Sequence, residues 1–220
     1  MKVSIVIPTK NEEKNLPHVL AEIPDNIDEV IIVDAHSKDK TVEIAAHYKA
    51  KVIYEDIGKG HALRLGMKEA KGEIIITMDA DYSNRINELN LLIEAIKAGY
   101  DIAMGSRFAT GGGSSDMPWL RRFGNKMFVM LVNLFWHTNY SDLCYGYRAF
   151  RKEIIPRLQL ESDGFGIETE ISIRAAKIKA RVIEIPSFEK ARLHGKGNLR
   201  TFPDGWNILK RIMKELFIRR

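Results

Sequence analysis

The chain has 220 residues, of which 45% are apolar and 29% are charged, and its formal net charge at neutral pH is +5. This length allows one sizeable domain, and the apolar fraction excludes a wholly disordered chain. The single cysteine, Cys144, excludes a disulfide framework and a zinc cluster built from cysteines. No stretch reaches the roughly 18 apolar residues of a membrane span, and no signal peptide is recognisable. We therefore expect a cytoplasmic protein and leave a peripheral contact with the membrane open.

The first half of the chain alternates between two kinds of pattern. Apolar runs rich in Ile and Val occupy residues 3–8, 29–34, 51–55, 72–81 and 100–107. Runs without polar alternation are typical of strands that are buried on both faces, as in parallel sheets. Helical patterns lie between them, at residues 12–22, 38–49, 60–70 and 87–98. The alternation predicts an α/β fold with a Rossmann-like, mainly parallel sheet flanked by helices.

After residue 107 the alternation stops. Residues 109–118 form a Gly/Ser loop without a pattern, either a mobile active-site loop or a plain surface excursion. We then expect a helix at 119–136, a strand at 144–150, a helix at 167–179, a strand at 182–187 and a basic loop at 189–198.

The chain closes with an amphipathic helix. Its predicted apolar face consists of Trp206, Leu209, Ile212, Met213, Leu216 and Phe217. Basic residues gather in the same segment, namely Lys210, Arg211, Lys214, Arg219 and Arg220. Such a helix either packs on the sheet or lies on a membrane surface, and the same alternatives hold for residues 127–136.

Ligands of open α/β sheets bind beyond the carboxyl ends of the strands, so a site is expected there. These ends carry Asp34, Glu55, Asp56, Asp79 and Asp81, and a crevice lined by carboxylates argues against nucleic acid as a partner. Asp79 and Asp81 follow a buried strand and point the same way in an extended chain. Two such oxygen ligands suit Mg²⁺ or Mn²⁺, although Asp81 could instead cap the following helix.

Five segments carry a specific resemblance. They read VSIVIPTKNEEKNL, EVIIVDAHSKDKT, GKGHALRLGM, IITMDADYS and AMGSRF, in this order. Together they resemble glycosyltransferase family 2, which has the GT-A fold, and most closely its dolichyl- and polyprenyl-phosphate sugar synthases. The resemblance implies a single domain over residues 1–220. Within it, residues 1–107 would bind the nucleotide, 108–200 would form the acceptor half and closing loop, and 201–220 the amphipathic C-terminal helix.

The resemblance also implies roles for matched residues. Nucleotide contacts are expected at Pro8, Thr9, Asn11, Glu12, Asp34, Ser37, Asp39 and Lys59, with Asp34 reading the base. Asp79 and Asp81, with Ala80 between them, match the motif that holds the metal on the donor diphosphate. Phosphate contacts are expected at Arg107, Arg121, Arg192 and Lys196, and Arg122 and Asn125 match acceptor-phosphate positions more loosely.

The implied reaction is metal-dependent, inverting transfer of a sugar from a GDP- or UDP-sugar to a polyprenyl or dolichyl phosphate. A divalent cation, Arg107 and Arg192 would stabilise the charge that develops on the leaving diphosphate. A phosphate acceptor has a second pKa of about 6 and needs no strong base. A hydroxyl acceptor would need a carboxylate, for which Asp142 and Glu168 are the candidates.

Other functions remain open at this stage. The segments SDLCYGYRAF and NLRTFPDGW depart from the pattern of dolichyl-phosphate mannose synthases, which leaves the sugar and the acceptor open. A soluble sugar or small alcohol is the alternative acceptor. A nucleotidyltransferase is a more remote alternative, because the Gly-rich, Arg-containing signature after the first strand is missing. The strand-end carboxylates argue against a protein that only binds membranes or nucleic acid.

Overall fold

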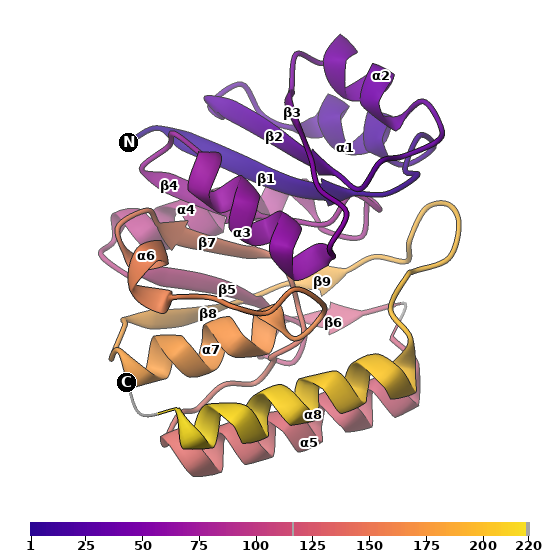
Figure 1. Ribbon diagram of the computed structural model, residues 1–220. Helices are drawn as coiled ribbons and strands as arrows, with labels where there is room; N and C mark the ends of the chain where they lie inside the picture. Colours follow the sequence, from indigo (N-terminus) through magenta and orange to yellow (C-terminus); the bar gives the residue numbers. More distant parts are fainter. Residues whose placement is uncertain (116, 219–220) are drawn as a thin grey trace.

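The computed structural model describes residues 1–115 and 117–218, so Arg219 and Arg220 of the predicted basic tail lie outside it. Its centre is a seven-stranded sheet with the order β3-β2-β1-β4-β7-β5-β8 (Figure 1). The strands are β1 (Val3–Thr9), β2 (Glu29–Asp34), β3 (Lys51–Tyr54), β4 (Ile74–Thr77), β5 (Ile102–Ser106), β7 (Arg148–Arg151) and β8 (Val182–Pro186). All neighbouring pairs are parallel except those of β7, which confirms the expected α/β fold.

Strand β7 comes from the second half of the chain but lies between β4 and β5 of the first half. It is antiparallel to both, so the two expected halves share one sheet. The strand predicted at 144–150 is wrong at its start, because β7 begins only at Arg148. The preceding segment is irregular and is held at the carboxyl end of β4, where Thr77 Oγ1 donates to the Gly146 carbonyl at 2.8 Å. This places residues 144–147 at the edge where a site is expected.

Helices cover both faces of the sheet. They are α1 (Leu16–Glu22), α2 (Thr41–His47), α3 (Lys59–Glu69), α4 (Leu89–Lys97, after a 3-10 turn at Ile86–Glu88), α5 (Trp119–Trp136), α6 (Ile154–Leu158), α7 (Ile167–Lys177) and α8 (Thr201–Phe217). Successive side chains of β1 point to opposite faces: Val6 packs in the core that includes α3 and α7, and Ile5 and Ile7 in the core that includes α1 and α4. The continuous apolar runs follow from this burial on both sides.

Helices α5 and α8 lie side by side in an outer layer, with α7 between them and the sheet (Figure 1). The predicted apolar face of α8 is only in part the face that the helix buries. Its buried residues include Ile208, Ile212, Arg211 and Glu215, whereas Trp206 is exposed. Met213 and Phe217 are exposed as well.

Buried ion pairs explain this orientation of α8. Glu215 accepts a hydrogen bond from Arg174 of α7 at 2.9 Å, and Arg211 pairs with the buried Glu170. Lys177 also contacts Glu215, at 2.5 Å. A helix face that is buried through paired charges is invisible to a search for apolar periodicity.

A second, two-stranded sheet pairs β6 (Gly113–Ser114) with β9 (Phe188–Glu189). This pairing connects the loop predicted at 109–118 to the start of the predicted closing loop. The structure describes that first loop except for position 116. A pairing of this length leaves no periodic signal in the sequence. It brings Glu189 to the edge of the site.

Candidate active site

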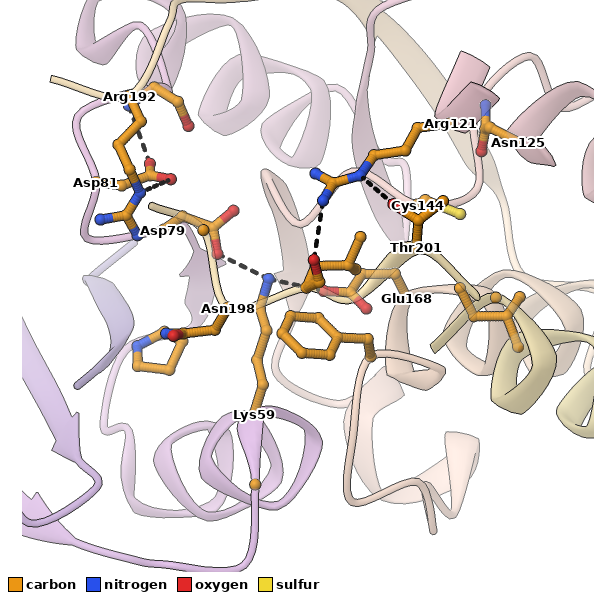
Figure 2. A pocket seen from close by; sticks show the side chains of 18 of the residues that line it. Lys59, Asp79, Asp81, Arg121, Asn125, Cys144, Glu168, Arg192, Asn198 and Thr201 are labelled. Carbon is orange, nitrogen blue, oxygen red and sulfur yellow. Dashed lines mark hydrogen bonds and ion pairs between the residues drawn. The ribbon is translucent and has the colours of Figure 1, made fainter. Parts of the chain in front are cut away.

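A cavity of about 820 Å³ opens at the carboxyl ends of the central strands and continues between α5 and α8. Its strand-end part is polar, and the part between the two helices is mostly apolar. The polar part is lined among others by Pro8, Thr9, Glu12, Glu55, Asp56, Lys59, Asp79, Ala80, Asp81, Arg107, Glu168, Glu189 and Arg192. The apolar part is lined by Leu120, Phe123, Met127, Phe128, Phe202, Trp206, Ile208 and Leu209. Figure 2 shows charged side chains from several elements converging on the polar part.

Lys59 links two carboxylates in the polar part (Figure 2). It stands at the first position of α3, and its Nζ lies 2.7 Å from Asp79 Oδ1 and 3.1 Å from Glu168 Oε1. Burial disfavours the charged amine, but Asp79 and Glu168 outweigh it and hold the pKa of Lys59 above its usual value. Gly146 permits this packing, because a Cβ there would lie 3.3 Å from Lys59 Nζ and 3.4 Å from Glu168 Oε1.

Asp81 faces a second cation, Arg192, whose Nε lies 3.5 Å from Asp81 Oδ2. Burial and the neighbouring charge of Asp79 raise the pKa of Asp81 above its usual value. The side chains of Asp79 and Asp81 are 28% and 20% exposed, so both are reachable from the cavity. These two acids repel each other, and each carries a positive group beside it.

This pair fits a divalent cation. Mg²⁺ is commonly held by one or two carboxylates together with substrate phosphates and water, and Asp79 and Asp81 supply two hard oxygen donors. Within residues 1–115 and 117–218, no group of three or more His, Cys, Asp or Glu side chains is arranged to hold a metal ion.

Arg107 is held by two carboxylates. Its Nε and Nη2 donate to Asp142 at 2.7 and 2.9 Å, and its Nη1 donates to Glu189 at 3.1 Å. Asp142 is fully buried and does not line the cavity. The residue that we expected as a candidate base therefore has both oxygens engaged in positioning Arg107.

The acids at the ends of β2 and β3 are also engaged internally. Asp34 accepts from Thr9 Oγ1 at 2.8 Å, Ser37 N at 2.7 Å and Ser37 Oγ at 2.6 Å, is fully buried and does not line the cavity. A direct contact of Asp34 with a base would require this arrangement to open. Glu55 accepts from the amides of Ile57 and Gly58 at the start of α3.

The other expected nucleotide residues lie beside the cavity. Asn11, with φ of 55°, and Asp39 line a neighbouring pocket of about 290 Å³, together with Lys196. Burial alone would raise the pKa of Asp39, but hydrogen bonds from Thr41 and Glu13 hold it below its usual value. Asn11 Oδ1 accepts from the amide of Lys38 at 2.8 Å. These side chains brace the turns after β1 and β2.

The segment that follows β9 is tied down at both ends. Arg192 donates to Glu12 at 2.7 and 2.9 Å, which joins the segment to the turn after β1. Arg121 of α5 donates to the Leu199 carbonyl at 2.8 Å and to Thr201 Oγ1 at 3.3 Å, which joins it to the start of α8 (Figure 2). Both arginines line the cavity.

Sequence reasoning missed Glu189. We assigned residues 189–198 to a basic loop, and the acid at its start attracted no attention. The structure places it in β9, lining the cavity, where its Oε2 accepts from Ser114 Oγ at 2.5 Å. Burial, followed by smaller effects of Asp79 and Asp142, raises the pKa of Glu189. No local signal marks it, because its position depends on the pairing of β9 with β6.

Comparisons with known proteins identify the family of this chain. The profile of the family "Glycosyl transferase family 2" matches residues 4–158. A dolichol-phosphate mannosyltransferase of Pyrococcus furiosus is 35% identical over 212 residues, which are 91% of this chain and 60% of that protein, so the chain spans less than two thirds of that relative. A dolichyl-phosphate hexose transferase of Haloferax volcanii is 32% identical over 216 residues, which are 96% of this chain and 92% of that protein.

A solved structure shows the same fold. Glucosyl-3-phosphoglycerate synthase of Mycobacterium tuberculosis, in complex with Mn²⁺, UDP and glucosyl-3-phosphoglycerate, superposes with a TM-score of 0.78. The match covers 100% of this chain and 81% of that one, at 18% identity. This likeness concerns the fold alone.

Proposed function

Because the chain belongs to glycosyl transferase family 2, we propose that it transfers a hexose from a GDP- or UDP-sugar to a polyprenyl or dolichyl phosphate, inverting the anomeric carbon. The observation that carries this proposal is the lining of the cavity. One continuous space joins the carboxylate pair after β4 to an apolar part between α5 and α8. A nucleotide sugar suits the first part and a prenyl chain suits the second.

The donor end would be organised by this chain's own charges. Asp79 and Asp81 would hold Mg²⁺ or Mn²⁺, which when bound neutralises charge on the diphosphate leaving group. Lys59, now 2.7 Å from Asp79, and Arg192, now bound to Glu12, lie beside these acids. We expect both to contact phosphate oxygens of the donor, where fixed cations would stabilise the charge that develops as the sugar departs.

The acceptor phosphate would lie on α5. Arg121 donates to Leu199 O and Thr201 Oγ1, both neutral acceptors, and among the described residues no carboxylate forms a salt bridge with it. Asn125 lines the same cavity, and its buried Nδ2 has no hydrogen-bond partner among those residues. A buried donor without a partner is costly, and a phosphate oxygen would satisfy it.

The reaction then needs little from the protein beyond positioning. A phosphate oxygen of the acceptor attacks the anomeric carbon from the face opposite the diphosphate. The new C–O bond forms as the bond to the diphosphate breaks, and the electron pair leaves with the diphosphate. The acceptor is already ionised, so Glu168 serves to hold Lys59 in place rather than to remove a proton.

The acceptor's location on a membrane agrees with the outer layer of helices. Both helices expose large apolar side chains at the same helical spacing, namely Trp119, Phe123, Met130 and Leu134 on α5 and Phe202, Trp206, Met213 and Phe217 on α8. Exposed lysines accompany them, Lys126 on α5 and Lys210 and Lys214 on α8. Such helices suit the interface of a membrane with anionic lipids. Among the described residues, no helix has the length and apolar character needed to cross a bilayer.

The test is an acceptor comparison. Purified protein is incubated with Mn²⁺ and labelled GDP- and UDP-hexoses, in parallel with polyprenyl phosphate in detergent and with soluble sugars and alcohols. The proposal expects transfer to the lipid phosphate alone. Transfer to a soluble hydroxyl compound instead would overturn the lipid acceptor, and absence of any nucleotide-sugar binding would overturn the enzyme class.

A further inference from the structure

One carboxylate that lines the cavity, Glu189, has no role in the proposed reaction. Glu189 lies in β9, and its side chain is 18% exposed. Arg107 Nη1 donates to its Oε1 at 3.1 Å, and Ser114 Oγ donates to its Oε2 at 2.5 Å. The carboxylate is therefore held from both sides, by a strand end and by the small second sheet. Each oxygen keeps a further lone pair for a ligand.

The charge around Glu189 determines which ligand it suits. Arg107 forms ion pairs with Asp142 and Glu189, and these three side chains make a cluster of one cation and two carboxylates. The cluster therefore has a net negative charge and would repel a phosphate. A surface rich in hydrogen-bond acceptors instead favours groups that donate hydrogen bonds, such as the hydroxyl groups of a sugar. The raised pKa of Glu189 agrees with a confined, acid-rich setting, to which Asp79 contributes.

The segment that carries Glu189 runs beside the metal-binding turn. The amide of Lys190 donates to the Ser83 carbonyl at 2.8 Å, and the amide of Leu193 donates to the Asp81 carbonyl at 3.3 Å. A hexose attached to a diphosphate at Asp79 and Asp81 is covalently confined to this neighbourhood. Its hydroxyl groups need acceptors on the adjoining wall of the cavity.

The other cavity-lining carboxylates are engaged or lie elsewhere. Glu12 is paired with Arg192, and Glu168 with Lys59. Glu55 binds the start of α3. Asp56 follows β3, at the opposite edge of the sheet from β8, the strand that leads to Glu189. Glu12 and Glu168 pair with Arg192 and Lys59, the cations assigned to the donor phosphates, whereas Glu189 is held by Arg107 and Ser114 on the segment that runs beside Asp81.

We propose that Glu189 binds a hydroxyl group of the donor hexose and so sets which hexose the enzyme accepts, with Arg107 and Ser114 fixing its carboxylate. This inference rests on the proposed function, because it assumes a nucleotide sugar in the cavity. A site built to accept a hydrogen bond from a hydroxyl group discriminates strongly against a sugar that places this group elsewhere. Glu189 is therefore a specificity determinant, separate from the residues that hold the nucleotide.

The test compares Glu189→Gln with the wild type. Calorimetry with Mn²⁺ measures the affinity for the free nucleoside diphosphate, and kinetics measure kcat/KM for pairs of epimeric sugar donors. We expect kcat/KM for the preferred hexose to fall about 10- to 100-fold, as for the loss of a hydrogen bond to a charged group. The preference between epimers should shrink by a similar factor, while the affinity for the free diphosphate changes less than about twofold.

Two controls keep the result interpretable. Glu94→Gln changes a surface acid of α4 that is 67% exposed and should leave both readouts unchanged. Glu189→Asp keeps the charge and should retain more epimer preference than Glu189→Gln. Two results would overturn the inference. In the first, Glu189→Gln reduces the affinity for the free nucleoside diphosphate by as much as it reduces kcat/KM for the sugar donor. In the second, it lowers kcat/KM for all epimeric donors by the same factor. A wild type that binds no nucleotide would instead overturn the proposed function.

Discussion

Lys59 Nζ lies 2.7 Å from Asp79 Oδ1, so the first residue of α3 neutralises a carboxylate at the end of β4. The same amine reaches the buried Glu168 at the start of α7. One lysine thus joins three elements that are distant in the sequence, and it keeps the acids of the cavity compatible with one another.

Removing this amine should destabilise the fold. In Lys59→Ala, Glu168 would remain buried without its cation, which costs about 3 kcal/mol for a broken buried ion pair. Lys51→Ala is the matched control, because Lys51 pairs with Glu69 at 2.9 Å on the surface, where both side chains are at least 40% exposed. It should cost less than about 1 kcal/mol. Urea unfolding of both variants measures the difference, and equal losses would contradict the role of Lys59.

The buried ion pairs of α8 predict a dependence on pH. Burial alone would raise the pKa of Glu215, but Lys177 and Arg174 hold it below the ordinary value of 4.5. Its contribution to stability is therefore present above the unfolded pKa and is lost as the pH falls through the folded one. Glu215→Gln should be clearly less stable than the wild type at about pH 7, and the gap should narrow below about pH 4.

Urea unfolding at several pH values measures this gap. Glu94→Gln, which removes the exposed partner of Lys97, serves as the control and should show a small gap throughout. A gap for Glu215→Gln that stays constant as the pH falls would show that the carboxylate charge is not what holds α8.

The exposed apolar stripes predict binding to lipid. Replacing Trp206 and Phe202 by Ser should abolish co-flotation with vesicles that contain phosphatidylglycerol, because burial of these rings in the interface drives binding. Leu91→Ser is the matched control, since Leu91 is 54% exposed on α4, which packs on the other face of the sheet. Flotation of the double variant at wild-type levels would exclude α8 as the docking surface.

The orphan amide of Asn125 gives an isosteric test of the acceptor subsite. Asn125→Asp keeps the oxygen that accepts from the Leu143 amide at 3.2 Å but replaces the unpartnered donor by a negative oxygen. A phosphate there would be repelled, so kcat/KM for the lipid phosphate should fall at least about 10-fold. The affinity of Asn125→Asp for the nucleotide should equal that of the wild type. Asn90→Asp, which makes the same change at an exposed amide of α4, is the control, and an unchanged KM for the lipid in Asn125→Asp would refute the subsite.

Part of this site could be predicted from the sequence because strand ends in α/β sheets have a fixed relation to ligands. Asp79, Asp81, Lys59, Arg107 and Arg192 stand in short motifs beside recognisable strands or helices, and the structure brings them to one cavity. Motifs also predict which residues lie close together within one turn, such as Asp34 and Ser37 in the turn after β2. They do not reveal that a matched acid such as Asp34 is buried.

The rest depends on contacts between distant segments. The place of β7 between β4 and β5 is set by pairing across the chain and has no local signature. Glu189 reaches the cavity through the pairing of β9 with β6. The orientation of α8 follows from ion pairs with α7, so the apolar face that periodicity marks is only in part the buried face.

The proposed donor site depends on binding of a nucleoside diphosphate by Asp79 and Asp81 through a divalent cation. Calorimetric titration of GDP and UDP, with and without Mn²⁺, into the wild type and into Asp79→Asn/Asp81→Asn tests it most directly. We expect one of the nucleotides to bind the wild type only with Mn²⁺, and its affinity for the double variant to be at least about 100-fold weaker, the scale of a lost electrostatic stabiliser. Equal nucleotide affinity without Mn²⁺, or in the double variant, would contradict it.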